Sequence, residues 1–206
     1  MFTALEDFRP SAAMRAEVRG FMDQREPEPE HVQHVRELAL SLFDQLKERH
    51  GLGEGARFLL ESAALLHDIG WSVAPDGRKH HKVAYDMIRS HRWAALPATL
   101  VPIIALVARY HRKSVPDAAH DGFAELDSAE QAIVRKLAAL LRVADALDRS
   151  HQSRVLAIAA KDTGAKVVLR LSSAGPCAAE LAAADAKKDL FEMAYGVPLV
   201  LLAPGI

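Results

Sequence analysis

The chain has 206 residues, of which 50% are hydrophobic and 26% charged, and its formal net charge is -1. This length allows one full hydrophobic core with a small appended unit, and the near-neutral charge gives no global basic field for nucleic acid. A single cysteine, Cys177, excludes an internal disulfide framework and fits a reducing compartment.

The sequence indicates neither a signal peptide nor a membrane-spanning segment. Residues 1–7 carry acids where a signal peptide has positive charge. The longest apolar runs are broken by Arg, His or Pro before they reach the length of a membrane span. We therefore expect a soluble cytoplasmic protein with no membrane partner and no strong nucleic-acid signal.

The first two thirds of the chain are predicted to be helical. Pro10-Ser11 is a start signal for a helix over residues 11–23, and an acidic stretch with two prolines (25–30) follows it. A three-and-four spacing of apolar residues from residue 31 to 46 predicts an amphipathic helix. A nearly all-apolar helix covers 58–68 and stops at Gly70, and further helices are predicted over 81–91, 97–112 and 128–148.

The pattern changes after residue 152. Short strands are predicted over 155–159 and 166–171, joined by the hairpin signal Asp162-Thr163-Gly164. A helix over 180–195 and a last strand over 197–202 follow, and Pro198 indicates that this strand lies at an edge. The predicted fold is mainly α: a helical body (1–152) followed by a small β-β-α-β unit (153–206).

Several polar residues fall beside apolar stretches that should be packed. A buried histidine or aspartate must be hydrogen-bonded, paired or bound to a metal, because desolvating it alone is costly. Imidazole and carboxylate groups together suit divalent Mn, Fe, Ni, Co or Zn, and the lack of thiolates disfavours a structural zinc site. The candidate residues, from separate predicted segments, are His31, His67, Asp68, His80, His81, His111 and Asp145.

The order of these residues resembles the HD phosphohydrolase superfamily. The resemblance rests on His31 followed by Val35, Leu38 and Ala39, on Leu65-Leu66-His67-Asp68-Ile69-Gly70, and on Asp145 within residues 141–151. In that superfamily the first His, the His-Asp pair and the late Asp ligate metal. The resemblance thus implies His31, His67, Asp68 and Asp145 as ligands, with His67 and Asp68 also assigned to catalysis.

A more specific resemblance is to the C-terminal domain of exopolyphosphatase / guanosine pentaphosphate phosphatase proteins. It is carried by residues 80–85, 108–113 and 148–151, and by a tail with Glu180 and Lys187, so it covers nearly the whole chain after the first helix. Long members carry an actin-like pair of domains in which polyphosphate is cleaved, and these 206 residues hold no such pair. Exopolyphosphatase activity is therefore not implied, and Val83 stands where the family often has another histidine.

The resemblance implies a metal-dependent phosphohydrolase acting on a nucleotide or another small phosphorylated metabolite. One or two divalent ions (Mn, Fe, Ni, Co, Zn or Mg) are expected per chain, with His80 or His81 and His111 completing a second site. Guanidinium and ammonium groups suit phosphate oxygens, so Lys82, Arg112, Lys113 and Arg149 are candidate phosphate contacts. The alternative for these four residues is a solvated charged surface. The alternative is a non-catalytic nucleotide- or polyphosphate-binding or dimerisation module, and a homodimer is left open.

Individual residues also have ordinary structural interpretations. His34 shares a helix face with His31 and competes for its role, and Asp145 could pair with Arg142 or Arg149. At least one of the adjacent pair at 80 and 81 is expected to be exposed. We expect packing roles for Trp71 and Trp93, and surface positions for His50, His91 and His120.

Overall fold

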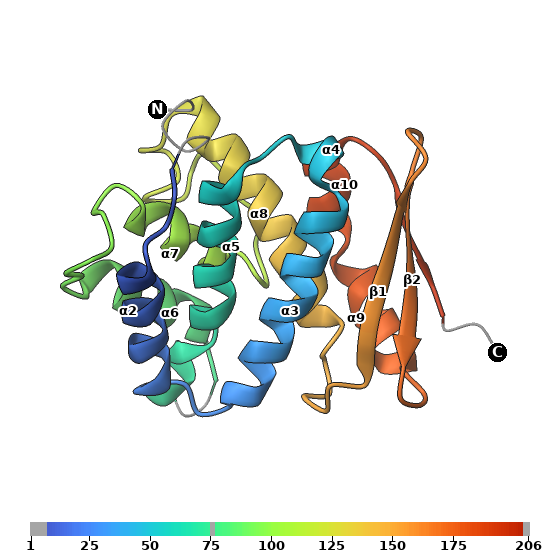
Figure 1. The fold of residues 1–206 in the computed structure, drawn as a ribbon, viewed down its shortest axis with the longest axis horizontal. Coiled ribbons are helices and arrows are strands. Elements are labelled where there is room, and N and C mark those ends of the chain that lie inside the picture. Colours follow the sequence, from blue (N-terminus) through green and yellow to red (C-terminus); the bar gives the residue numbers. More distant parts are fainter. Residues whose placement is uncertain (1–7, 75–76, 204–206) are drawn as a thin grey trace.

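The computed structural model describes residues 8–74 and 77–203, so the acidic segment 1–7 lies outside the described residues. The predicted mainly α architecture is confirmed (Figure 1). Neighbouring contacts join α3, α5, α7 and α8 into a bundle, with α2 and α6 on one side of it. The elements of this body are α2 (Ala12–Asp23), α3 (Pro29–Gln45), α4 (Lys47–His50), α5 (Glu54–Leu66), η1 (Ile69–Ser72), α6 (His80–Ser90), α7 (Val101–Arg109) and α8 (Ser128–Ala146).

Local capping explains where several helices begin. The Ser11 side chain accepts a hydrogen bond from the amide of Met14 at the start of α2. At the start of α8, Asp127 and Glu130 form a reciprocal capping box that satisfies two otherwise unpaired amides. These side chains fix the entry points of the helices that frame the bundle.

Helices α5, α7 and α8 end earlier than predicted, and the differences matter for the site. The predicted end at residue 68 is wrong, because α5 ends at Leu66 and leaves Asp68 outside regular helix. The predicted end of α7 at 112 is also wrong, because the helix ends at Arg109 and the backbone turns to a positive φ at Lys113. Gly70 does not act as the C-terminal glycine of α5; it lies inside η1, where α6 approaches its backbone closely.

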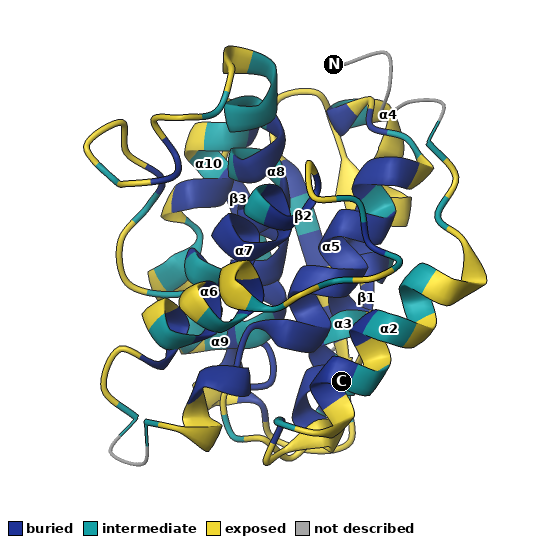
Figure 2. Cartoon of the chain, turned by 90° about the vertical axis from the view of Figure 1, so that its left-hand side faces the viewer, coloured by how far each residue is buried: buried dark blue, intermediate teal, exposed yellow. Residues whose placement is uncertain are grey.

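The core runs through the middle of the bundle. Figure 2 shows α5, α7 and α8 largely buried at the centre, whereas α2 and α6 carry exposed outer faces. Every residue of α5 from Phe58 to Leu66 is buried, as its nearly unbroken apolar run predicts. Polar side chains at the ends of these core helices are therefore buried with them.

The C-terminal part is a three-stranded sheet with two helices. Strand β1 (Val155–Asp162) pairs antiparallel with β2 (Val167–Ser173), and β3 (Leu199–Leu202) pairs parallel with β2. The order β1-β2-β3 confirms the predicted edge position of the last strand. The single helix predicted over 180–195 is wrong in one respect, because Lys188 divides it into α9 (Ala178–Lys187) and α10 (Asp189–Tyr195).

Helices α9 and α10 join this sheet to the helical body. Both contact α8, α9 also contacts β3, and Figure 1 shows the two helices between the body and the sheet. Strand β1 contacts α3. The division of the chain at residue 152 stays a prediction.

No helix among the described residues is both long and apolar enough to span a membrane.

Candidate metal centre

The ends of five helices bring polar side chains to one place. His31 lies in the first turns of α3, and His67 and Asp68 directly follow α5. Asp145 lies in the last turn of α8. His80 is the first residue of α6, and His111 lies just beyond the end of α7. The packing of α3, α5, α7 and α8 on one another brings these ends together.

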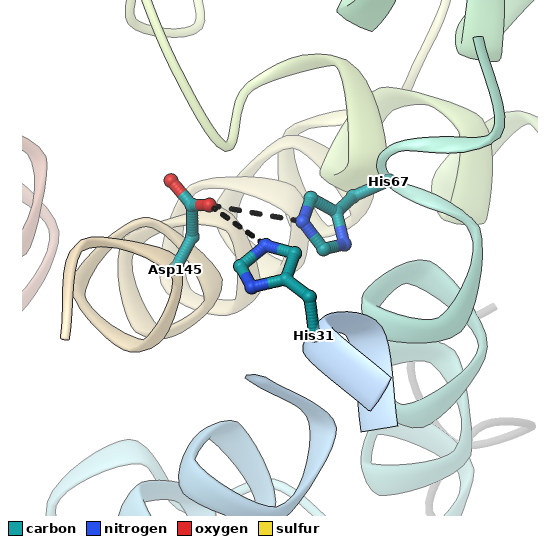
Figure 3. Close-up of side chains that lie close together, drawn as sticks. All are labelled: His31, His67 and Asp145. Atoms are coloured by element: carbon teal, nitrogen blue, oxygen red, sulfur yellow. Dashed lines mark ion pairs between the residues drawn. The ribbon is translucent and has the colours of Figure 1, made fainter. Parts of the chain in front are cut away.

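A first group consists of His31, His67 and Asp145. Their candidate ligand atoms all lie within 4.8 Å of one another. Asp145 Oδ1 is 3.7 Å from Nε2 of each imidazole, and Figure 3 shows both rings directed at this carboxylate. Two neutral imidazoles and one carboxylate within such distances can share one divalent cation.

Asp68 connects this group to a second one. Its Oδ2 lies 3.8 Å from His31 Nε2 and 3.6 Å from His67 Nε2. Its Oδ1 lies 3.1 Å from His80 Nε2 and 3.5 Å from His111 Nε2, and these two nitrogens are 3.4 Å apart. The two oxygens of one carboxylate thus face two separate sets of imidazole nitrogens.

The four imidazoles of His31, His67, His80 and His111 present the same nitrogen to the centre. In each ring Nδ1 is engaged by an acceptor outside the cluster, so the proton is assigned to Nδ1 and Nε2 faces the centre. The Nδ1–acceptor distance is 2.8 Å in three rings and 3.0 Å in the fourth. The acceptors are Asp148 Oδ2 for His31 and the main-chain carbonyl oxygens of Ala64, Gly77 and Ala108 for His67, His80 and His111.

Several atoms that face the centre have no hydrogen-bond partner within the protein. His31 Nε2, His67 Nε2 and Asp68 Oδ1 are all buried and unpartnered within the described part of the chain. A buried polar atom without a partner is costly, whereas these are the donor atoms that a divalent cation takes. The residues present therefore fit a bound metal ion.

The carboxylates and imidazoles perturb one another's protonation. Burial lowers the pKa of His31, but the nearby carboxylates of Asp145 and Asp148 outweigh it and raise the pKa to about 10. Burial raises the pKa of Asp68, but His67 and His80 outweigh it and hold it well below its usual range. Burial and the charge of His67 lower the pKa of His111 far below its ordinary value. In the metal-free protein His31 thus holds a proton that a cation would displace.

Three acidic or aromatic neighbours of the centre were given no role from the sequence. Fully buried Asp148 accepts hydrogen bonds from His31 Nδ1 and from the amide of Ser153, both at 2.8 Å. His151 stacks on His31 with ring centroids 3.7 Å apart, and burial raises the pKa of Glu26 to about 7. The signal for Asp148 was its place three residues after Asp145, in the 148–151 segment that carries the family resemblance.

Replacing Asp148 with asparagine is expected to weaken metal binding by about 10- to 100-fold, as usual when the partner of a metal-ligating histidine is changed. The amide keeps an acceptor for His31 Nδ1 but loses the charge that makes Nε2 a stronger donor. Metal affinity would be measured by competition with a chromogenic chelator. Exposed Asp86 on α6 supplies the matched control, Asp86→Asn. An affinity of Asp148→Asn within twofold of wild type would contradict this role.

A cavity of about 330 Å³ opens beside the centre. Arg112, Lys113 and Arg149, which the sequence assigns to phosphate, line it together with metal-ligand candidates. Lys82 does not line this cavity; it lines two adjoining hollows that Arg112 also borders. The cavity walls are Asp68, Trp71, His80, His111, Arg112, Lys113, Asp145, Arg149, His151, Ala183, Ala186 and Lys187.

His81 lies apart from the other histidines. Its ring centroid is 5.9 Å from that of His80 and 6.3 Å from that of His111, and its side chain lines the hollows that contain Lys82. The expectation that one of the adjacent pair is exposed is wrong, because both are buried. Burial and the neighbouring His80 and Arg112 side chains lower the pKa of His81 to about 4.

The ordinary structural interpretations have mixed outcomes. The surface position predicted for His50 is wrong, because the ring is buried between the carbonyl of Phe43 and the amide of Leu52. Asp145 pairs with Lys187 at 2.6 Å, rather than with either arginine considered from the sequence. Trp71 stacks on His80 with ring centroids 4.6 Å apart.

Comparison with known families gives one match over most of the chain. The family model described as Ppx/GppA phosphatase, domain III, matches residues 15–186. That range contains every residue of the two groups around Asp68 and every residue assigned to phosphate. No curated protein matches the chain. Because the match covers far more than half of the sequence, the chain belongs to the family of Ppx/GppA phosphatase domain III.

Proposed function

We propose that this protein is a metal-dependent phosphohydrolase of the HD superfamily that acts on a nucleotide or another small phosphorylated metabolite. The observation that carries the proposal is that four imidazoles around Asp68 all engage Nδ1 elsewhere and leave Nε2 facing Asp68. Their Nδ1 atoms are engaged outward while their Nε2 atoms converge on a carboxylate whose two oxygens face different pairs. Histidines that serve only packing have no reason to share this arrangement.

His31, His67, Asp68 and Asp145 would hold one divalent ion, and Asp68, His80 and His111 would hold a second. Bound metal in such a site lowers the pKa of water and neutralises phosphate charge. The mixture of imidazole nitrogen and carboxylate oxygen donors suits Mn, Fe, Ni, Co or Zn, and it suits Mg less well. The placement of His81 favours His80 as the histidine of the second group.

The cationic side chains of the cavity would bind and orient the substrate. Arg112, Lys113 and Arg149 line the same cavity as Asp68 and Asp145, so a phosphate there would contact both the cations and the centre. The guanidinium of Arg112 is already directed at the centre, because its Nη1 lies 3.1 Å from His80 Nε2. Burial of the imidazoles on the inner side leaves the cavity as the side open to substrate and water.

Elemental analysis of protein purified without chelator, together with a hydrolysis screen, tests the proposal. We expect one or two transition-metal ions per chain, and release of inorganic phosphate from at least one nucleotide or phosphorylated metabolite. Chelation should abolish hydrolysis and re-addition of Mn, Fe, Ni, Co or Zn should restore it. Absence of metal after incubation with each of these ions would overturn the proposal. Full metal occupancy with nucleotide binding but no turnover would instead favour a non-catalytic binding module.

A further inference from the structure

The C-terminal part of the chain contributes a lysine side chain to the cavity beside the candidate metal centre. Lys187 is the last residue of α9, and its Nζ lies 2.6 Å from Asp145 Oδ2. The other oxygen of Asp145 faces His31 and His67 at 3.7 Å. Lys187 also lines the cavity next to the centre, where its side chain is 24% exposed. It is therefore within reach of both a metal ligand and any anion in the cavity.

A buried arginine fixes the backbone at Lys187. Lys187 stands at the break between α9 and α10, and Arg142 Nε donates to its carbonyl at 3.3 Å. Nη1 of the same guanidinium donates to the Lys113 carbonyl at 3.0 Å. Arg142 is 5% exposed, so a buried guanidinium connects the backbones of Lys113 and Lys187, which come from distant segments.

The backbone at Lys113 is held in an unfavourable conformation. Its φ is +61°, in the left-handed region that a residue with a side chain rarely adopts. Such strain persists where surrounding contacts enforce it, and it gathers at binding sites. The two hydrogen bonds of Arg142 thus hold Lys113 and Lys187 beside the same cavity.

Charge balance indicates what Lys187 does once a cation is present. Asp145 is now shared between the imidazoles and Lys187. A divalent ion among the ligands would draw the negative charge of Asp145 and weaken its attraction for Lys187. The ammonium group would then face the cavity beside Arg112, Lys113 and Arg149, an array of cations that favours an anion.

We propose that Lys187 is a phosphate contact of this site, supplied by the C-terminal α9 helix and held in place by Arg142. This inference rests on the proposed function and adds a residue to it. It makes residues beyond 152 part of the substrate site rather than an appended unit. The ligand class is a phosphate group, recognised by an ammonium hydrogen bond at the metal-loaded centre.

Binding of inorganic phosphate to the metal-loaded full chain tests the proposal. For Lys187→Gln we expect phosphate affinity to fall about tenfold, the loss typical of one charge-assisted hydrogen bond, with metal content unchanged. Lys187→Arg should retain affinity within about threefold, since it keeps the charge. The matched control is Lys188→Gln, whose wild-type side chain pairs with Asp185 and Glu192 instead. Isothermal titration calorimetry would measure the binding of the metal ion and of inorganic phosphate to each variant.

The outcomes separate this inference from the proposed function. Weakened phosphate binding in Lys187→Gln supports the contact even when wild-type protein hydrolyses nothing in the screen. Unchanged phosphate binding in Lys187→Gln overturns the contact, even when wild-type protein is an active hydrolase. Loss of metal from Lys187→Gln also overturns it, because the lysine would then act only by holding Asp145. Where substrate turnover is found, KM should rise more than kcat falls.

Discussion

Asp68→Asn is expected to remove metal from the centre and with it nearly all hydrolysis. The substitution leaves an oxygen and a neutral amide where two anionic oxygens face two pairs of imidazoles. The expected loss of metal affinity exceeds about 100-fold, beyond the range for residues that only orient a ligand. The hydrolysis rate should fall by about a thousandfold, which corresponds to about 4 kcal/mol of lost transition-state stabilisation.

The experiment combines elemental analysis with steady-state kinetics on the substrate found in the screen. Asp44→Asn is the matched control, because Asp44 is an exposed carboxylate that pairs with Arg57 on the surface. Circular dichroism would verify that both variants keep their helical content. A folded Asp68→Asn protein with full metal and wild-type kcat would show that Asp68 is no ligand.

Gly70→Ala should be among the most destabilising single-methyl additions in the chain. A Cβ at Gly70 would lie 2.1 Å from the carbonyl oxygen of His80 and 2.8 Å from the amide nitrogen of Ala84. Both atoms belong to the backbone of α6, so η1 and α6 must move apart. Overpacking of this kind costs about 3 kcal/mol. His80 would shift with α6, and the second metal group would be weakened at the same time.

Chemical denaturation of the metal-free protein measures the first effect, and metal stoichiometry measures the second. Gly20→Ala is a sharp control, because Gly20 lies within α2 and nothing stands within 4 Å of a Cβ there. That variant should be more stable by about 0.5–1 kcal/mol, the usual difference between alanine and glycine in a helix. Equal stability of Gly70→Ala and wild type would mean that α6 does not approach η1 this closely in solution.

The sequence predicted the helical body because its signals are local. A three-and-four apolar spacing and the cap at Ser11 depend on a few neighbouring residues, so they identify α2 and α3 without knowledge of the rest. The unbroken apolar run of α5 likewise predicts a buried helix. Helix ends were less predictable, since α7 stops at Arg109 without a glycine or proline at that point.

Sequence order also indicated which residues to consider together. His31, His67, Asp68, His80, His111 and Asp145 were selected by their types and by a family resemblance, and the structure places all six around one centre. Their roles as ligands stay predictions until metal is measured. The pattern has limits. His81 and Lys82 follow His80 in sequence but line a separate hollow. His50, assigned to the surface, is buried.

By itself, the sequence determined the helical periodicity, the small C-terminal sheet, the family and the candidate ligands. Only the tertiary structure decided how Asp68 divides its oxygens between two groups, and which nitrogen of each imidazole faces inward. His31 meets Asp148 across 117 residues, and Lys187 meets Asp145 across 42. These contacts depend on how α3 and α9 pack against α8, and no short-range pattern in the chain encodes that arrangement.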